Sequence, residues 1–348
     1  MKKIVIILVV SLLFISKCYA AQNEIVMDAD SGRVLYGKNT NQKELIASTT
    51  KIMTALVVLN NTNLKDEIIV GKEVSDAYGS AIYIKEKEKL LVKDLLYGLL
   101  LRSGNDATLS LAVYTAGSVD GFVKLMNETA MYIGMKNTVF TNPHGLDEES
   151  ENISTVYDMA ILMREAMKNK DFRKITSTRK YDLKTNFNTY SWYNKNKLLE
   201  IYEFATGGKI GYTKRAKHTF VSSATKDNKN LIIATFKDDD QFNTHKTLYE
   251  KYFKIYKKYR LIDKNKLKIK YDKNYKVYTL SNFDMLLTRN EKKKIKRTIT
   301  FYKNVKCNDS CNLGKIEISL DNKIYKTLNI YAERIKDNKK KKIFNYFS

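Results

Sequence analysis

The order of strand-like and helix-like segments constrains the fold of this 348-residue chain more than any other feature. Strand-like segments lie at both ends of the first 256 residues, and segments with helical spacing lie between them. The strands are predicted at 24–28, 33–36, 219–223 and 231–236, and the helices at 47–59, 90–101, 107–116, 121–133, 156–167 and 245–256. This order predicts an α+β domain with an inserted helical subdomain.

The sequence pattern changes after about residue 257. Short alternating segments are separated there by Lys- and Asn-rich turns, which predicts a small β-rich domain. Its strands are predicted at 275–280, 298–302, 315–320 and 324–330. We therefore predict three parts: a leader over 1–20, an α+β domain over 21–260 and a basic β-rich domain over 261–348.

The first 20 residues have the pattern of a secretory signal peptide. Lys2 and Lys3 precede the apolar run 4–15, and Cys18-Tyr19-Ala20 places small residues where a signal peptidase cleaves. An uncleaved N-terminal anchor is the alternative. Export predicts a protein of the extracytoplasmic cell envelope, in the periplasm or at the cell wall. Cysteines 307 and 311 can then form a local disulfide in an oxidising compartment, or stay a reduced pair; no second Cys or His pair lies nearby to suggest zinc.

The chain is strongly basic, with 62 Lys and Arg against 38 Asp and Glu. Residues 261–348 hold 23 of the basic and 9 of the acidic residues. Such charge favours nucleic acid, anionic lipid or an anionic wall as a partner. Export argues against nucleic acid as the partner, and so does the absence of a recognised nucleic-acid-binding motif. The basic run 339–342 suggests peripheral contact with a membrane or wall, and a solvated terminus is the alternative.

Ser48 and Lys51 lie three residues apart at the start of the helix predicted over 47–59. Residues at this spacing share one helix face, so the amine can reach the hydroxyl. A serine hydroxyl becomes a good nucleophile when a base takes its proton, and a lysine can do this when burial or nearby positive charge lowers its pKa. The same spacing also occurs by chance, where the serine caps a helix and the lysine faces solvent.

Two further short motifs follow in the chain. Ser103-Gly104-Asn105 interrupts two apolar helices, where its hydroxyl can relay a proton and its amide can hold a peptide; a plain turn is the alternative. Lys209-Ile210-Gly211 precedes Tyr212-Thr213 in an expected edge strand, where a substrate backbone can lie alongside; a surface strand is the alternative. In this order the three motifs resemble those of the penicillin-recognising serine hydrolases.

Longer runs resemble the serine D-alanyl-D-alanine carboxypeptidases, which are the low-molecular-mass penicillin-binding proteins of peptidase family S11. The runs are Asp28–Leu35, Ala47–Leu56, Leu99–Ala107, Asn137–Asp147 and Asn196–Leu199. The resemblance spans about residues 24–256, and the β-rich tail is similar to the family's C-terminal domain in position and texture. It implies an antiparallel sheet flanked by helices, with the active site between the sheet and the helical subdomain.

The resemblance also implies a reaction and roles. Ser48 would be acylated by peptidoglycan stem peptides ending in D-Ala-D-Ala, and by β-lactams, with Lys51 as its base. Ser103 and Asn105 would pass protons and orient the peptide. Lys209, Gly211, Tyr212 and Thr213 would be substrate-binding residues, with the backbone N–H groups of Ser48 and Tyr212 as the oxyanion hole. No metal or organic cofactor is expected.

The chain departs from the family pattern at three places. Ile210 stands where the family has threonine, Lys217 stands where it has glycine after an alanine, and Gln241 stands where it has an arginine. All three concern recognition of the terminal carboxylate, and Lys214, Arg215 or Lys217 are candidate substitutes. A weak or inactive peptidoglycan-binding relative is therefore the alternative function. A β-lactamase is disfavoured by the basic β-rich tail.

Overall fold

The computed structural model describes residues 21–267, 269, 271–272, 274–305 and 307–335. The predicted signal peptide and the basic run 339–342 lie outside the described residues. The chain divides into two compact units. Of the described residues, the first comprises 21–27, Val34–Lys226 and Asn230–Lys251, and the second comprises Asp28–Arg33, Asp227–Lys229 and those from Tyr252 onward. The domain boundary at 260/261 stays a prediction.

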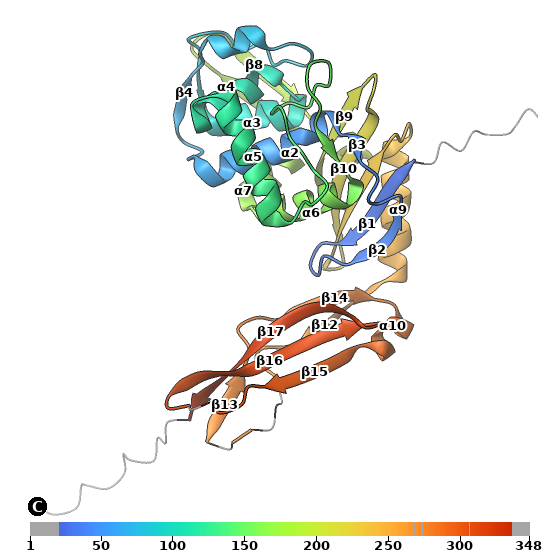
Figure 1. Cartoon of the computed structure of the whole chain (residues 1–348). Helices are drawn as coiled ribbons and strands as arrows, with labels where there is room; N and C mark the ends of the chain where they lie inside the picture. The colour runs from blue at the N-terminus through green and yellow to red at the C-terminus, as the bar shows by residue number, and fades with distance from the viewer. Residues whose placement is uncertain (1–20, 268, 270, 273, 306, 336–348) are drawn as a thin grey trace, which may run out of the picture. The chain divides into compact units, whose positions relative to one another are not determined.

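A five-stranded sheet is the framework of the first unit (Figure 1). Its strands lie in the order β2-β1-β11-β10-β9. Their bounds are Asn23–Asp28 for β1, Val34–Lys38 for β2, Ala205–Thr213 for β9, Lys217–Lys226 for β10 and Lys229–Phe236 for β11. The pairs β1–β2 and β9–β10 are antiparallel. The order brings the hairpin at the start of the chain beside strands more than 190 residues later, and it leaves β9 at the sheet edge.

Helix α9 (Gln241–Ile255) packs on this sheet through aromatic side chains of the two elements. The ring of Phe220 on β10 lies 4.2 Å from that of His245 and 5.4 Å from that of Phe242. His245 is fully buried, and its two ring nitrogens contact hydroxyls of Ser222 and Thr235. The predicted closing helix at 245–256 therefore exists, and it begins four residues earlier.

A helical subdomain is inserted between β2 and β9 (Figure 1). Its central helix α2 (Lys51–Asn61) is buried along its first eight residues, as expected of a helix covered on all sides. Around it lie η1 (Ala47–Thr50), η2 (Lys72–Asp76), α3 (Val92–Tyr97), η3 (Gly98–Arg102), α4 (Asn105–Ala116), α5 (Val119–Ile133), α6 (Val156–Ala166), α7 (Lys170–Ser177) and α8 (Leu198–Ile201). Short strand pairs complete it: β3 (Glu44–Leu45) with β6 (Ile153–Ser154), β4 (Glu67–Ile69) with β5 (Lys89–Leu91), and β7 (Lys180–Lys184) with β8 (Thr189–Tyr193).

Local signals explain where several of these helices begin and end. The Ser118 hydroxyl accepts a bond from Gly121 N at the start of α5, and Gly134 ends that helix with a φ of 89°. Thr155 caps α6 in the same way. The predicted helix 47–59 begins as the 3₁₀ turn η1, and the predicted helix 90–101 ends in the π-helical turn η3, so only Ser103-Gly104 separates it from α4.

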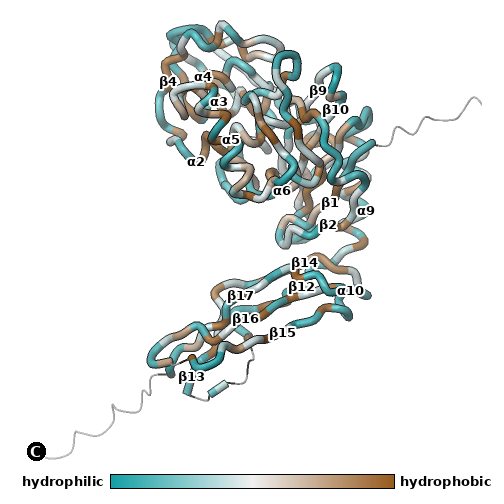
Figure 2. Tube along the Cα trace, viewed as in Figure 1, coloured by the Kyte–Doolittle hydropathy of each residue, from teal (hydrophilic) through white to brown (hydrophobic). Residues whose placement is uncertain are grey.

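The second unit is rich in β-strands, as predicted. Its four-stranded sheet has the order β13-β17-β16-β15, and β12 pairs with β14. The bounds are Lys257–Ile262 for β12, Tyr275–Tyr278 for β13, Phe283–Leu287 for β14, Lys296–Phe301 for β15, Ser310–Leu320 for β16 and Lys323–Arg334 for β17, with the short helix α10 at Arg289–Lys294. Figure 2 shows hydrophobic residues recurring along β14 and β16. Cys307 and Cys311 form the predicted disulfide beside this core.

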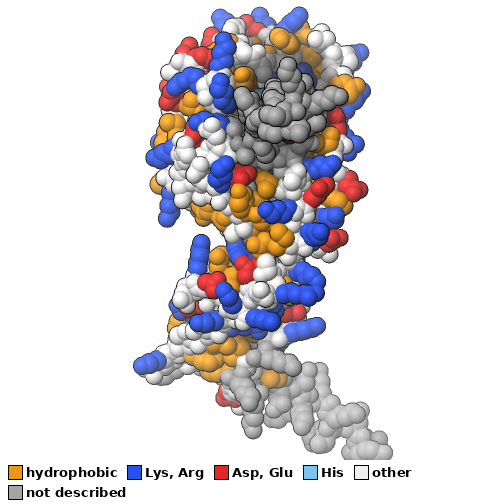
Figure 3. All heavy atoms as spheres, turned by 90° about the vertical axis from the view of Figure 1, so that its right-hand side faces the viewer, with side chains coloured by type: hydrophobic (Ala, Val, Ile, Leu, Met, Phe, Trp, Pro, Cys, Tyr) orange, Lys and Arg blue, Asp and Glu red, His pale blue; other side chains and the backbone are white. Residues whose placement is uncertain are grey.

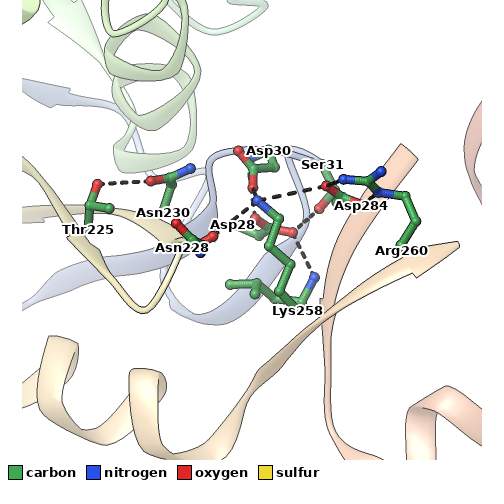
Figure 4. Close-up of polar contacts among 10 residues, drawn as sticks. Asp28, Asp30, Ser31, Thr225, Asn228, Asn230, Lys258, Arg260 and Asp284 are labelled. Atoms are coloured by element: carbon green, nitrogen blue, oxygen red, sulfur yellow. Dashed lines mark hydrogen bonds and ion pairs between the residues drawn. The ribbon is translucent and has the colours of Figure 1, made fainter. Parts of the chain in front are cut away.

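The turn Asp28–Arg33 belongs to the second unit and is held there by polar contacts (Figure 4). The Asp28 carboxylate accepts the backbone N–H of Leu286 at 3.0 Å and the hydroxyl of Ser31. Lys258 Nζ lies 2.6 Å from Asp30 Oδ2. The Asp-x-Asp-Ser run therefore packs this unit, a use that the sequence pattern did not reveal.

Charge is distributed over the surface rather than gathered at a metal site. Figure 3 shows Lys and Arg side chains spread across one face, with fewer Asp and Glu among them. Among the described residues, no group of three or more His, Cys, Asp or Glu is placed to hold a metal ion. Within the same residues, no helix has the length and apolar character needed to cross a membrane.

Candidate active site

Lys51 is the centre of a buried hydrogen-bond cluster at the start of α2. Its side chain is fully buried, and Nζ lies 3.2 Å from Ser48 Oγ. Nζ also lies 2.7 Å from Asn105 Oδ1 and 2.8 Å from the carbonyl oxygen of His144. The turn η1 places Ser48 one turn before Lys51, as the three-residue spacing predicts. Three predicted site residues, Ser48, Lys51 and Asn105, are therefore brought together.

Burial and nearby charge both act on the Lys51 amine. Burial lowers the pKa of Lys51 well below its usual value, and the positive charges of Lys209 and Lys195 lower it further. The carboxylate of Asp106 acts in the opposite direction. The Asp106 carboxylate itself accepts hydrogen bonds from the backbone N–H groups of Ile82–Ile84. These bonds stabilise its negative charge and fix that segment. The result is a lysine that loses its proton more easily than one in water.

Ser103 and Asn105 are positioned by the break between η3 and α4. Ser103 has a φ of 67°, in the left-handed region that few residues with a side chain adopt. Its hydroxyl is buried without a hydrogen-bond partner among the described residues. The Asn105 side chain spans the site, since its Oδ1 faces Lys51 and its Nδ2 donates to the carbonyl of Tyr78 at 2.5 Å.

The edge strand β9 passes directly over the start of η1. A Cβ atom added at Gly211 would lie 2.8 Å from the backbone nitrogen of Ser48 and 2.6 Å from Thr219 Oγ1. Only glycine fits this close approach, which explains the glycine of the Lys209-Ile210-Gly211 motif. The outer edge of β9 pairs with no other described strand, so β9 is an edge strand as predicted. Addition of a substrate chain along it stays a prediction.

Lys209 brings a second buried amine to the same place. Burial, reinforced by the charge of Lys195, lowers the pKa of Lys209 to about 7. Its Nζ donates to the carbonyl of Ile210 at 2.8 Å. The charge of Lys209 also lowers the pKa of Lys51, so the protonation of Lys51 depends on that of Lys209.

Ser48, Ser103, Lys209 and Gly211 line one cavity of about 570 Å³. Its lining is Ser48, Ser80, Ser103, Asn194, Lys195, Lys197, Glu200, Lys209, Ile210, Gly211, Tyr212, His218, Gln241 and Phe242. The cavity therefore reaches from the hydroxyl of Ser48 to the first turn of α9, along the edge strand. Lys51 and Asn105 lie behind its wall.

Similarity to known proteins was assessed against this geometry. Residues 16–240 match the model of a peptidase family described as D-alanyl-D-alanine carboxypeptidase. The chain belongs to this D-alanyl-D-alanine carboxypeptidase family. Residues 249–336 match the penicillin-binding protein 5 C-terminal domain. The resemblance inferred from the motifs and the predicted α+β fold with a β-rich C-terminal domain are thereby confirmed.

Individual relatives agree with this assignment. D-alanyl-D-alanine carboxypeptidase DacF of Bacillus subtilis is 37% identical over 224 residues, which is 63% of this chain and 57% of that protein, so the match spans less than two thirds of the relative. DacB2 of Mycobacterium tuberculosis is 36% identical over 62% of this chain and 74% of its own length. The crystal structure of penicillin binding protein 5 from Haemophilus influenzae has a TM-score of 0.77 at 28% identity, covering 90% of this chain and 96% of that one.

Two of the three departures from the carboxypeptidase pattern are found in the cavity lining. Ile210 and Gln241 both line it, beside Tyr212 and His218. Gln241 is buried, and its Oε1 has no hydrogen-bond partner among the described residues. Ile210 offers no polar side-chain group at all. The cavity lining therefore lacks the two side chains that the family pattern leads us to expect.

The substitutes proposed from the sequence are placed elsewhere. None of Lys214, Arg215 and Lys217 lines the cavity. Arg215 instead donates to the carbonyl oxygen of Asp147 at 2.7 Å and pairs with Glu151. The turn that carries these residues directs Arg215 toward the loop 147–151, so Arg215 is engaged away from the cavity. That one of the three residues replaces the missing arginine stays a prediction.

Tyr212 and Thr213 are both placed at the end of β9, in different surroundings. Tyr212 is 56% exposed, and its ring lies 4.6 Å from that of His218. Thr213 donates its hydroxyl to Asp147 Oδ2 at 2.6 Å and accepts the N–H of Ala216 at 2.9 Å. Thr213 does not line the cavity, so it shapes the end of β9 rather than facing the space beside Ser48.

Sequence reasoning missed two contributors to the site. The backbone carbonyl of His144 binds Lys51, and an added Cβ at Gly145 would meet Ala47 O at 1.9 Å, so the 142–147 loop packs tightly on η1. Lys195 lines the cavity and lowers the pKa of both Lys51 and Lys209. A carbonyl carries no side-chain signature, and Lys195 lies in a basic run that resembles an ordinary solvated loop.

Proposed function

We propose that this chain is a serine D-Ala-D-Ala carboxypeptidase that removes the terminal D-alanine from peptidoglycan stem pentapeptides. The observation that carries the proposal is the arrangement around Lys51 Nζ. A neutral amine has two N–H donors and one lone pair. The oxygens of Asn105 and His144 take the two donors at 2.7 and 2.8 Å, which leaves the lone pair for the Ser48 hydroxyl at 3.2 Å.

In the acylation step, Lys51 takes the proton of Ser48 as Oγ attacks the carbonyl carbon of the D-Ala-D-Ala bond. The bond to the terminal D-alanine breaks, its nitrogen receives the proton, and an ester to Ser48 remains. The lowered pKa of Lys51 supports this role, because a base must be unprotonated when it acts. The unpartnered hydroxyl of Ser103 provides a route for the proton to the leaving amine.

The oxyanion is assigned to the backbone N–H groups of Ser48 and Tyr212. Ser48 lies in the first turn of a helical segment, where N–H groups have no partner within the helix. The close approach of β9 at Gly211 brings the next residue, Tyr212, to the same side of the cavity. Water then attacks the ester, with Lys51 again as the base, and releases the shortened peptide.

β-Lactams are expected to acylate Ser48 by the same steps, and their acyl-enzyme should persist long enough to be isolated. The proposal places the protein outside the cytoplasm, since its substrate is peptidoglycan. The signal peptide over 1–20 and contact of the basic C-terminal domain with a membrane or wall stay predictions. Nucleic acid is not a proposed partner.

A catalytically weak, peptidoglycan-binding relative is the second candidate. It is favoured by one specific observation, the pair Ile210 and Gln241 in the cavity lining. Loss of a hydrogen bond to a carboxylate costs roughly 1.5–3 kcal/mol, so substrate positioning would suffer more than the chemistry at Ser48. The two candidates agree on acylation by penicillin and differ in the rate of D-alanine release.

The test is mass spectrometry of the protein after exposure to labelled benzylpenicillin. One equivalent of label should appear on the peptide that contains Ser48, and Ser48→Ala should abolish it. Thr49→Ala is a matched control, since its hydroxyl is buried against the carbonyl of Ile46 at the next position in the same turn. Labelling that persists in Ser48→Ala places the nucleophile elsewhere, and an unlabelled wild type contradicts the proposal.

A further inference from the structure

The cavity lacks the arginine and the threonine that the family pattern predicts, but it does not lack positive charge. Lys195 and Lys197 line the cavity together with Lys209. The described residues of the lining include one acidic side chain, Glu200, and it is exposed. A cavity with this balance attracts an anionic group.

Lys195 differs from Lys197 in burial and surroundings. Lys195 is partly buried, whereas Lys197 is exposed to solvent. Burial and the charge of Arg102 lower the pKa of Lys195. No ion pair involves Lys195 within the described part of the chain, and its Nζ donates only a long bond to Ser80 Oγ, at 3.4 Å. A partly desolvated ammonium without an anionic partner is unfavourable, so a bound carboxylate would stabilise it.

The position of Lys195 is set by the same element that presents Ser103. Its backbone N–H donates to the carbonyl of Leu101 in η3, two residues before Ser103. Its charge acts on both Lys209 and Lys51. In a D-Ala-D-Ala peptide the terminal carboxylate lies on the order of 4 Å from the carbonyl that Ser48 attacks, by ordinary covalent geometry. Lys195 lines the same cavity as Ser48 and Lys209, so its amine is placed to meet that carboxylate.

We propose that Lys195 binds the C-terminal carboxylate of the peptide substrate, in place of the side chains that Ile210 and Gln241 replace. This inference rests on the proposed function and deepens it. In this account the carboxylate is bound not beside Gln241 in α9 but at the wall that Ser103 and the 194–197 loop form. Lys195 is a substrate-binding residue in this account, and the chemistry stays with Ser48 and Lys51.

The direct test compares a free carboxylate with a neutral terminus. The substrates are diacetyl-L-Lys-D-Ala-D-Ala and its C-terminal amide, neither of which has a side-chain carboxylate. Lys195→Gln should lower kcat/KM on the free acid roughly tenfold or more, through KM, and change the amide less than about twofold. Lys195→Arg should retain most of the preference for the acid.

The ratio between the two substrates separates binding from indirect effects. Removing the charge of Lys195 also raises the pKa of Lys51 and Lys209, but that change affects both peptides alike. Lys197→Gln removes an exposed amine of the same loop and should leave the ratio unchanged. His218→Asn alters the opposite end of the cavity and should also leave it unchanged.

A second measurement applies if peptide turnover is too slow to follow. Second-order rates of Ser48 acylation are measured with benzylpenicillin and with its methyl ester, which lacks the carboxylate. Lys195→Gln should lower the acid-to-ester ratio by a similar factor. An unchanged ratio in Lys195→Gln with normal labelling, or a loss confined to His218→Asn, overturns this inference alone. Failure of the wild type to be labelled contradicts the proposed function instead.

Discussion

The two ends of the cavity are built in different ways. At the Ser48 end, Lys51 is fully buried and has three oxygens within 3.2 Å. At the other end, Ile210 offers no side-chain hydrogen bond, and Gln241 Oε1 lacks a partner among the described residues. A single substitution at the first end would break several of these contacts. A substitution at the second end would break fewer hydrogen bonds. The residues proposed for acylation therefore keep the family pattern, while those expected to bind the terminal carboxylate depart from it.

Gly211→Ala should have the largest effect of the variants that test this contrast. The new Cβ would lie 2.8 Å from Ser48 N and 3.0 Å from Ala47 Cβ, so β9 or η1 must shift. The φ of Gly211 lies outside the left-handed range, so crowding and not backbone strain decides the outcome. We expect acylation by penicillin to fall about 100-fold, since a displacement near 1 Å at a reacting group costs about that much.

Gly71→Ala is the matched control for that variant. Its added Cβ would meet the end of the flexible Glu73 side chain, which can move aside. Acylation rates of both variants are followed by mass spectrometry, with circular dichroism to verify folding. A folded Gly211→Ala protein that acylates at the wild-type rate would show that the Ser48 end tolerates more displacement than its contacts imply.

Ile210→Thr, alone or with Gln241→Arg, should have a smaller effect in the opposite direction. Each change restores a group that can donate to a carboxylate at the weakly constrained end. We expect kcat/KM for D-alanine release from diacetyl-L-Lys-D-Ala-D-Ala to rise about tenfold per restored contact, equivalent to about 1.4 kcal/mol. The gain should be larger in the Lys195→Gln background, where the carboxylate has lost its proposed partner.

Acylation by the methyl ester of benzylpenicillin serves as the control for these restored contacts. It lacks the carboxylate, so its rate should not change with Ile210→Thr. A wild-type enzyme that already releases D-alanine rapidly, and that both substitutions slow, would mean that Lys195 and its neighbours supply full recognition. The two ends would then differ in their residues but not in how well they position the substrate.

The sequence predicted the parts of this site that depend on local spacing. Ser48 and Lys51 share one turn, so helical periodicity alone brings them together. Likewise, β9 was expected at a sheet edge because its lysine and glycine suit strand addition. The contact between Lys51 and Asn105 spans 54 residues. The family resemblance, not the spacing, predicted that both residues belong to one site, and neither predicted the contact itself.

Other features depend on tertiary packing that no local pattern reveals. The His144 carbonyl reaches Lys51 because Gly145, with a φ of 89°, packs against Ala47. The placement of Lys195 follows from a backbone bond between residues 94 positions apart in the chain. Strands β7 and β8, helix α7 and the pairing of β12 with β14 were likewise not predicted, because their short segments lack a long periodic pattern.

Removal of the Cys307–Cys311 disulfide should have the smallest effect on the cavity. The bond closes a loop of five residues in the second unit, whose chain-entropy contribution is about 2 kcal/mol or less. Both cysteines pack beside the hydrophobic core of that unit, so paired Cys→Ser substitution should lower its unfolding temperature and leave acylation at Ser48 unchanged. Differential scanning calorimetry and penicillin labelling of the same sample measure the two effects. A parallel loss of labelling would show that acylation at Ser48 depends on the fold of the β-rich unit. The difference between the two ends of the cavity could then not be explained by the residues of the first unit alone.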